Sequence, residues 1–215
     1  MSPVDDEFVR RRTTEATLRD GTRVLLRPIL PKDKAELLDG FRRLSPESRY
    51  RRFLSPVDEL TEEQLRNLTE IDYVDHFAWV AFDLGDAGHP GIGVARYVRV
   101  AGEPEVAEAA VTVVDDYQGR GLGTLLLEAL GAVALENGIT TFRGYALEEN
   151  QPILEVLDGL GASTAHDSPG LVRVEIDLRV GEKPGSPLRE VLRLLARGDG
   201  PAFLRPDRLS DKTPG

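Results

Sequence analysis

A glycine-rich segment that joins an expected strand to an expected helix is the strongest constraint on the fold of this chain. The strand spans residues 106–114 and is rich in valine, and the helix spans 124–136 and ends at Asn137-Gly138. Between them lie Gln118-Gly119-Arg120-Gly121-Leu122-Gly123-Thr124. Glycines before a helix let backbone N–H groups approach an anion at the positive end of the helix dipole. With the added charge of Arg120, the segment predicts a site for a phosphate or pyrophosphate group.

Two familiar phosphate-binding motifs fit this segment less well. A P-loop is excluded because no Gly-Lys-Ser/Thr follows the glycines. A Rossmann dinucleotide site is a closer rival, since Glu148 or Glu149 near the end of the next strand could bind a ribose. In the Rossmann motif, however, the third glycine follows at a different spacing from the one found here. That motif also lies at the start of its fold, whereas several expected elements precede Gly119 in this chain.

The order of the expected elements indicates an α/β (α+β) fold with a mixed central sheet flanked by helices. A hairpin turns at Asp20-Gly21, and helices are expected at 31–44, 46–53 and 61–69, the last after a capping-box pattern. Strands follow at 76–83, 91–100, 106–114, 140–147 and 171–178, and helices at 124–136 and 152–160. Short turns favour antiparallel pairing early in the sheet, and helical crossovers favour parallel pairing late.

The length of 215 residues suits one full domain with appendages. We expect a flexible N-terminal segment at residues 1–14, the main domain at 15–180, and a linker, an amphipathic helix and a tail at 181–215. That helix carries Leu188, Val191, Leu192 and Leu195 on one face, so we expect it to dock on the domain or on a second copy of the chain.

Charge and composition exclude several classes of function. The net charge of -10 argues against nucleic-acid binding and against docking on anionic membrane. The absence of cysteine excludes disulfides and thiolate chemistry, and the three separated histidines (His76, His89 and His166) predict no metal site. No signal peptide or spanning segment is present, so we expect a cytoplasmic enzyme or binding protein.

Residues 118–124 resemble the acyl-CoA pyrophosphate loop of the GNAT superfamily of N-acetyltransferases. The order of elements from about Thr17 to Leu178 resembles the same fold. Within the superfamily, residues 27–29 (RPI), 44–53 (LSPESRYRRF) and 113–121 (VVDDYQGRG) are similar to bacterial protein lysine acetyltransferases of the Pat type. The resemblance therefore implies an acetyltransferase with acetyl-CoA as its cosubstrate.

The resemblance also implies roles for particular residues. The main chain around Val111 and Val113 would pair with the pantetheine arm. Asn150 would contact the cofactor, although it could equally cap the next helix. The pyrophosphate would be wrapped by Gln118, Gly119, Arg120, Gly121, Leu122, Gly123 and Thr124. We interpret the arginine-rich run at 42–52 as a solvated helical face, or as a surface that contacts the 3'-phosphate of the cofactor or a partner.

Glu108 matches the strand glutamate that several family members use as a general base. Alternatively, Glu108 is a solvent-facing residue at a sheet edge with no role in catalysis. Only about one lysine amine in a thousand is the free base at neutral pH, a deficit of roughly 4 kcal/mol, so a base near the acceptor is needed. A backbone N–H near Val113 would stabilise the oxyanion. Many family members have a tyrosine at position 157 that acts as the general acid, but this chain has Leu157. Tyr117, Tyr145 or water would then have to protonate the departing thiolate.

We therefore expect acyl transfer to a cationic primary amine, with a protein lysine favoured by the Pat-type resemblance. Glu103, Glu105 and Glu108 cluster at the start of one strand, which is compatible with a cationic acceptor. A small-molecule amine acetyltransferase and a non-catalytic acyl-CoA sensor on the same fold are the alternatives.

Overall fold

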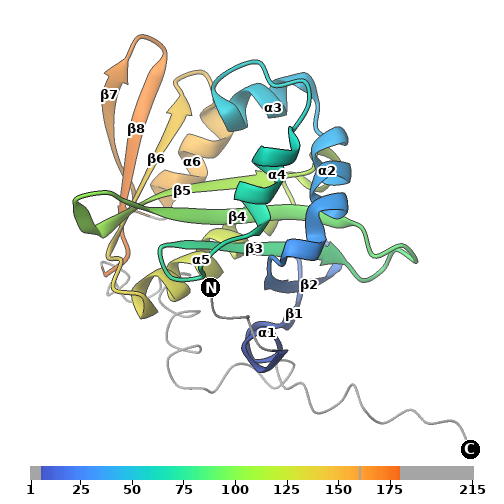
Figure 1. The fold of residues 1–215 in the computed structure, drawn as a ribbon. Coiled ribbons are helices and arrows are strands. Elements are labelled where there is room, and N and C mark those ends of the chain that lie inside the picture. Colours follow the sequence, from blue (N-terminus) through green and yellow to red (C-terminus); the bar gives the residue numbers. More distant parts are fainter. Residues whose placement is uncertain (1–5, 160, 180–215) are drawn as a thin grey trace, which may run out of the picture.

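An eight-stranded mixed sheet forms the centre of the protein (Figure 1). The computed structural model describes residues 6–159 and 161–179. The strands lie in the order β1-β2-β3-β4-β5-β6-β8-β7, and only β5 and β6 pair in parallel. Their bounds are β1 (Thr14–Thr17), β2 (Arg23–Pro28), β3 (His76–Asp83), β4 (Gly91–Val100), β5 (Glu103–Val113), β6 (Thr141–Leu147), β7 (Ser163–Ser168) and β8 (Leu171–Asp177).

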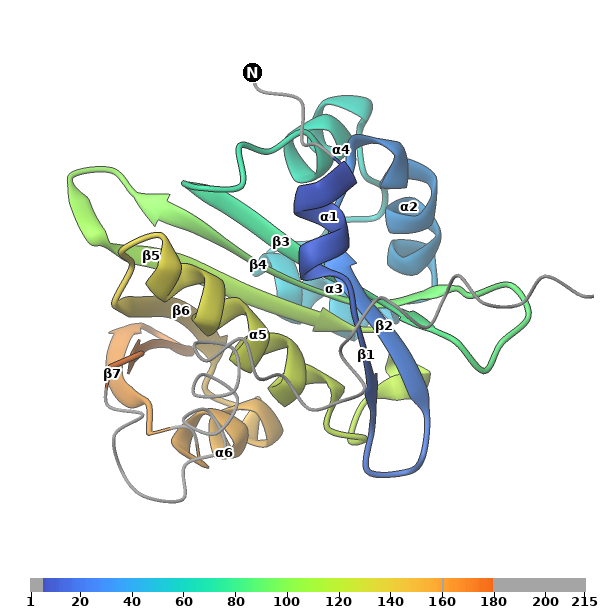
Figure 2. The ribbon, with the colours of Figure 1, turned by 90° about the horizontal axis from the view of Figure 1, so that it is seen from below.

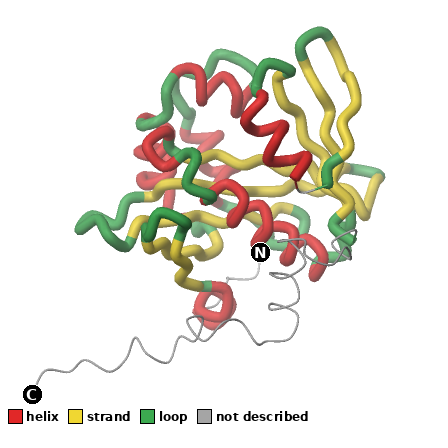
Figure 3. Tube along the Cα trace, turned by 180° about the vertical axis from the view of Figure 1, so that it is seen from behind, coloured by secondary structure: helices red, strands yellow, loops and turns green. Residues whose placement is uncertain are grey.

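Helices cover both faces of the sheet. The views from below and from behind place α1 and α5 on one face, with α2, α3 and α4 on the other (Figures 2 and 3). The α-helices are α1 (Asp6–Arg12), α2 (Lys34–Arg42), α3 (Pro46–Phe53), α4 (Glu62–Thr69), α5 (Leu122–Glu136) and α6 (Gln151–Gly159), and two 3-10 turns are η1 (Pro31–Asp33) and η2 (Asp115–Tyr117). None of the described helices is long and apolar enough to cross a membrane.

Local sequence signals explain where the helices on the α2 face begin. Ser45 caps α3 by accepting the N–H of Ser48 at 3.1 Å, and proline occupies the first helical position. The capping box expected before α4 is formed, because Thr61 and Gln64 exchange hydrogen bonds of 3.2 and 2.8 Å. These helices bury a small apolar cluster of Phe41, Leu44, Leu60 and Leu65.

The larger core lies on the α5 face. Leu122, Leu126 and Leu130 of α5 are at most 1% exposed and pack on the sheet with Phe77 and Tyr97. This confirms the deep packing that the nearly all-apolar sequence of this helix predicts.

Two elements differ from the sequence-based expectations. Residues 1–14 are expected to be flexible, yet α1 forms there, with Phe8 edge-on to Tyr73 at 5.4 Å and Arg12 bonded to Glu136 at 2.7 Å. The expected parallel pairing late in the sheet is wrong beyond β6, because the unforeseen strand β7 reverses the chain and β8 returns antiparallel to β6. Strand β7 is polar and mostly exposed, so no apolar alternation marks it. The helix expected after residue 181 lies outside the described residues.

Candidate active site

Strands β5 and β6 separate after a short parallel contact. Their pairing covers only Val106–Glu108 on β5, opposite Thr141–Arg143, whereas β6 continues to pair with β8 as far as Leu147. Residues 109–113 of β5 therefore have a strand partner on the β4 side alone.

The hydrogen-bond pattern with β4 shows which backbone groups face this gap. Val114 donates its N–H to the carbonyl of Ile92 at 3.0 Å, and antiparallel partners exchange such bonds at every second residue. In this register, Ala109, Val111 and Val113 turn their N–H and C=O groups away from β4 and toward the gap. An extended ligand can pair with this open edge as an additional strand would.

The glycine-rich loop closes one end of the gap. Gly119 and Gly121 adopt φ values of 73° and 91°, which glycine tolerates and other residues rarely adopt. Helix α5 starts two residues earlier than expected, at Leu122, and its first intrahelical bond is donated by Leu125 to Gly121 at 3.1 Å. The N–H groups of residues 122–124 therefore lie at the free, positive end of the helix, whose first turn holds no acidic residue.

A cleft of about 490 Å³ follows the open edge and the loop, which is within the usual size of small-molecule sites. Most of the predicted cofactor residues line it: Val111, Val113, Gln118, Gly119, Gly121, Gly123, Thr124 and Asn150. Among the described residues, the side chain of Asn150 has no hydrogen-bond partner, so it does not cap α6 through its amide. The amide nitrogen of Gln118 donates to Val113 O at 3.1 Å.

Two predicted cofactor residues do not line the cleft. Leu122 is 1% exposed and belongs to the core under α5. Arg120 stacks over the Tyr117 ring at 4.8 Å and donates hydrogen bonds to Asp20 and to the carbonyl of Asp116. The guanidinium that the sequence places at the phosphate site is thus held by other groups in this structure.

Other arginines line the cleft in its place. Arg19, from the turn between β1 and β2, lies beside the loop, where a β-carbon on Gly121 would be 3.8 Å from its Nε atom. Arg51 and Arg52 come from α3. A contact of the arginine-rich run with the cofactor is one of the two interpretations given for residues 42–52, and Arg51 and Arg52 belong to that run. No sequence signal, however, links Arg19 to a loop 100 positions away.

Glu108 lies where β5 and β6 begin to separate. It is exposed and does not line the cleft. Its register neighbour Arg143 is engaged elsewhere, by two bonds of 2.9 Å to Glu103 and one of 3.0 Å to Glu175. Within the described part of the chain, the Glu108 carboxylate has no hydrogen bond or ion pair, so it is available to a ligand.

The tyrosines considered as general acids differ in their availability. Tyr117 donates its hydroxyl proton to Asp83 at 2.8 Å, and burial, followed by that bond, raises its pKa. Tyr145 lines the cleft, is 40% exposed, and its hydroxyl has no partner in the described residues. Leu157 also lines the cleft and packs against the core. Tyr145 is therefore the better placed proton donor.

The same part of the chain contains no group of three or more residues arranged to hold a metal ion.

Comparison with known proteins agrees with this geometry. Residues 23–163 match the acetyltransferase (GNAT) domain family. The chain is 41% identical over 161 residues to the acetyltransferase Pat of Mycolicibacterium smegmatis, covering 75% of this chain and 47% of that protein. It is 34% identical over 145 residues to an acetyltransferase of Pseudomonas aeruginosa, covering 67% of this chain and 77% of that one. The GNAT domain of S. lividans PAT superposes with a TM-score of 0.70 at 31% identity, covering 77% and 96% of the two chains.

The chain therefore belongs to the GNAT acetyltransferase family. The matched domain and both of these relatives are named as acetyltransferases. It spans about half the length of its Mycolicibacterium relative. The open strand edge, the helix N-terminus and the cleft volume fit an elongated ligand that carries amides at one end and phosphates at the other.

Proposed function

We propose that the chain acetylates lysine side chains of proteins, with Glu108 as the general base. The observation that carries this proposal is the unpartnered, exposed carboxylate of Glu108 at the start of the open edge of β5. A protein lysine as the acceptor is supported by the similarity to the acetyltransferase Pat.

In this proposal the β5 edge and the α5 N-terminus hold acetyl-CoA. The backbone groups of Val111 and Val113 pair with the amides of its pantetheine arm. The N–H groups of residues 122–124 bind the pyrophosphate, with Gln118, Gly119, Arg120 and Gly121 around them. The Asn150 amide, which makes no bond of its own in the described residues, contacts the cofactor.

The proposed chemistry begins with removal of a proton from the lysine ammonium. Glu108 accepts it, directly or through a water molecule, which offsets the deficit of roughly 4 kcal/mol in free amine at neutral pH. The amine nitrogen then bonds to the thioester carbonyl carbon, and a backbone N–H of the open β5 edge near Glu108 stabilises the oxyanion. The nitrogen loses its second proton to water, the C–S bond breaks as the amide forms, and Tyr145 or water protonates the departing thiolate. Since a thiol has a pKa near ~8.5, this last step needs little acid assistance.

Replacing Glu108 by Gln tests the base. General bases contribute about 10²–10⁴ in rate, and we expect a loss near the lower end because water reaches this exposed position. The dissociation constant for CoA should stay the same, since Glu108 lies outside the cleft. Glu105→Gln is the matched control, because it removes the same charge from an exposed position on the same strand. Unchanged turnover of Glu108→Gln at every pH would remove this residue from the mechanism.

Acceptor assays test the rest of the proposal. Lysine peptides and small amines are compared with acetyl-CoA as donor, and the CoA released is measured. Acetylation of small amines alone would identify a small-molecule enzyme. Binding of CoA without transfer to any acceptor would identify a sensor, and either result overturns the assignment to protein lysine.

A further inference from the structure

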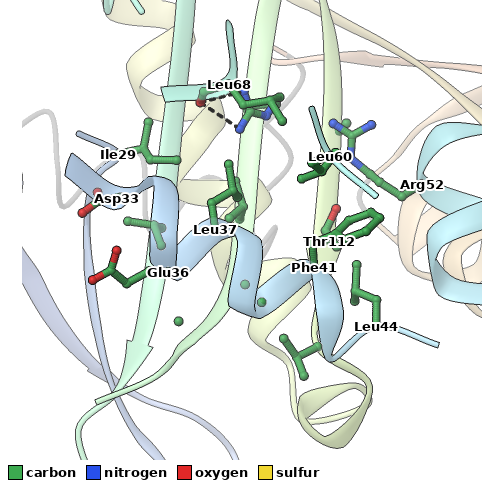
Figure 4. Close-up of a pocket in the computed structure, with 18 of the residues that line it drawn as sticks. Ile29, Asp33, Glu36, Leu37, Phe41, Leu44, Arg52, Leu60, Leu68 and Thr112 are labelled. Atoms are coloured by element: carbon green, nitrogen blue, oxygen red, sulfur yellow. Dashed lines mark hydrogen bonds between the residues drawn. The ribbon is translucent and has the colours of Figure 1, made fainter. Parts of the chain in front are cut away.

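Two arginines close to the β5 face that carries Glu108 have no acidic partner in the part of the chain that the structure describes. Arg96 on β4 is 6% exposed and sits opposite Ala110 of β5. Because side chains alternate along a strand, Arg96, Ala110 and Glu108 share one face of the sheet, the face turned away from α5. Arg52 reaches the same region from α3, and both arginines line a cavity of about 70 Å³ beneath α2 (Figure 4).

The hydrogen bonds of Arg96 use only part of its guanidinium. Nη1 and Nη2 both donate to the carbonyl of Leu68 at 3.2 Å, as the dashed lines in Figure 4 show. Nη1 also lies 3.1 Å from Nε2 of His76, which accepts as a neutral ring, since burial and then Arg96 lower the pKa of His76 to about 4. The Nε–H and the second Nη2–H have no partner in the described residues, and guanidinium N–H groups of this kind bind carboxylates in pairs.

Arg52 is less constrained than Arg96. Its guanidinium stacks on Phe53 at 5.0 Å and makes no hydrogen bond or ion pair within the described ranges. It lines both the small cavity and the larger cleft, so it stands between the acceptor face and the cofactor site.

No carboxylate of residues 6–159 or 161–179 neutralises these two charges. The acidic residues of the cavity, Asp33 and Glu36, lie at the end opposite Arg52 (Figure 4), and Asp33 is paired with Arg27 at 2.6 Å. Burial, and then the charge of Arg52, lowers the pKa of Arg96 to about 9, and no acidic residue of the described ranges offsets this effect. Buried charges without counterions are costly, so this pair is suited to an anion supplied from outside.

We propose that Arg52 and Arg96 bind the side-chain carboxylate of an aspartate or glutamate two residues before or after the target lysine. This inference rests on the proposed function and names the sequence context that the acceptor site selects. Residues i and i+2 of an extended peptide place their side chains on one side about 7 Å apart, the same spacing as Glu108 and Ala110. Glu108 then faces the lysine ammonium while the arginines face the neighbouring acid.

The size and position of the cavity favour an acceptor side chain over the cofactor. At about 70 Å³ it has about one seventh of the 490 Å³ volume of the cleft, so it suits a single side chain better than an elongated cofactor. It also lies on the face of the sheet opposite α5, whereas the proposed pyrophosphate site is at the N-terminus of that helix.

Matched peptides test the inference. Lysine peptides with Glu at position −2 or +2 are compared with peptides that carry Gln there, using the full chain and acetyl-CoA. We expect the better Glu peptide to have about tenfold higher kcat/KM than its Gln counterpart, equal to about 1.4 kcal/mol. Arg52→Gln should reduce this ratio to about one, and Arg52→Lys should restore part of it.

Control measurements separate this role from others. Arg42→Gln removes the same charge from an exposed position of α2 and should leave the ratio unchanged. CoA affinity is measured for Arg52→Gln because this residue also lines the cofactor cleft. Arg96→Gln is the second variant, and Arg52→Gln alone decides the matter if Arg96→Gln does not fold.

Each remaining outcome is decisive. Equal rates for Glu and Gln peptides in the wild type overturn the inference and leave lysine acetylation intact, whereas no acetylation of any lysine peptide refutes the proposed function itself. A Glu preference that persists in Arg52→Gln assigns it to other residues. A preference for succinyl-CoA over acetyl-CoA that Arg52→Gln abolishes would assign the arginines to the acyl group instead.

Discussion

Replacing Gly123 by alanine should change stability and cofactor affinity in opposite directions. Gly123 lies in the first turn of α5 and, unlike Gly119 and Gly121, has no positive φ. A β-carbon at this position would lie 3.8 Å from Cγ2 of Val113, which is ordinary van der Waals contact. Alanine is therefore accommodated in the free protein, and its higher helix propensity should stabilise the fold by about 0.5–1 kcal/mol. For a chain of this size the Tm should rise by about 1–4 °C.

The same methyl group should weaken binding of CoA. It would occupy space beside the free N–H groups of the first turn of α5, where the proposed pyrophosphate must approach. Losing one hydrogen bond to a charged group costs about 1.5–3 kcal/mol, which corresponds to roughly 10- to 150-fold weaker binding. Gly123 therefore tests the cofactor site without the backbone strain that complicates substitutions at its two neighbouring glycines.

Calorimetric titration with CoA and thermal unfolding in its absence measure the two effects. Gly40→Ala in α2 is the matched control, since its β-carbon would also meet only ordinary contacts and it lies outside the cofactor cleft. We expect Gly40→Ala to stabilise the protein and to bind CoA as the wild type does. If Gly123→Ala also binds CoA normally, the loop is not the pyrophosphate site and the reasoning fails.

Further substitutions test the loop, the buried histidine and the proton donor. Gly121→Ala forces a left-handed conformation on alanine and places its β-carbon against Arg19, so chemical denaturation should show a loss of about 1–2 kcal/mol. His76 has a folded pKa of about 4 against ~6.5 when unfolded, so the unfolded state binds its proton first and stability falls as pH drops from 6.5 toward 4. After allowance for solvent screening, the wild type should lose about 1–2 kcal/mol more than His76→Gln between pH 7 and pH 5 in urea unfolding; equal losses would contradict the burial argument. Tyr145→Phe should lower kcat without changing the KM for acetyl-CoA, and an unchanged kcat would leave protonation of the thiolate to water.

The sequence predicts those parts of the fold that depend on neighbouring residues. Strands β3 and β4 occupy the expected ranges, because apolar residues mark both strands and a turn separates them. The loop is likewise encoded by consecutive residues, and Gly119 and Gly121 have the positive φ that their type permits. Strand β7 escapes prediction because its pairing with β8, and not its own polar sequence, makes it a strand.

The candidate site also consists of a part that the sequence predicts and a part that only the tertiary structure brings together. Residues 118–124 form one local motif, but the arginines around the two cavities come from a hairpin turn, from α3 and from β4. Only the sheet register and the hairpin turn bring Arg19 and Arg96 there, so periodicity and spacing cannot find these two, whereas Arg52 belongs to the arginine-rich run that the sequence singles out. The net charge of -10 also conceals this arrangement, since the described residues that line the cleft include four arginines and no acidic residue.

Strand β5 explains how one element can serve both substrates. Its alternating side chains divide between two faces, so Val111 and Val113 pack toward α5 while Glu108 and Ala110 face the acceptor side. The contact between Val113 and the first turn of α5 holds the helix N-terminus next to the open strand edge. Backbone groups for the cofactor and a carboxylate for the amine are thus held in one rigid unit, and the distance between them does not depend on a mobile loop. The separation of β5 from β6 exposes both sets of groups at once, because a longer parallel pairing would cover the edge that the cofactor needs.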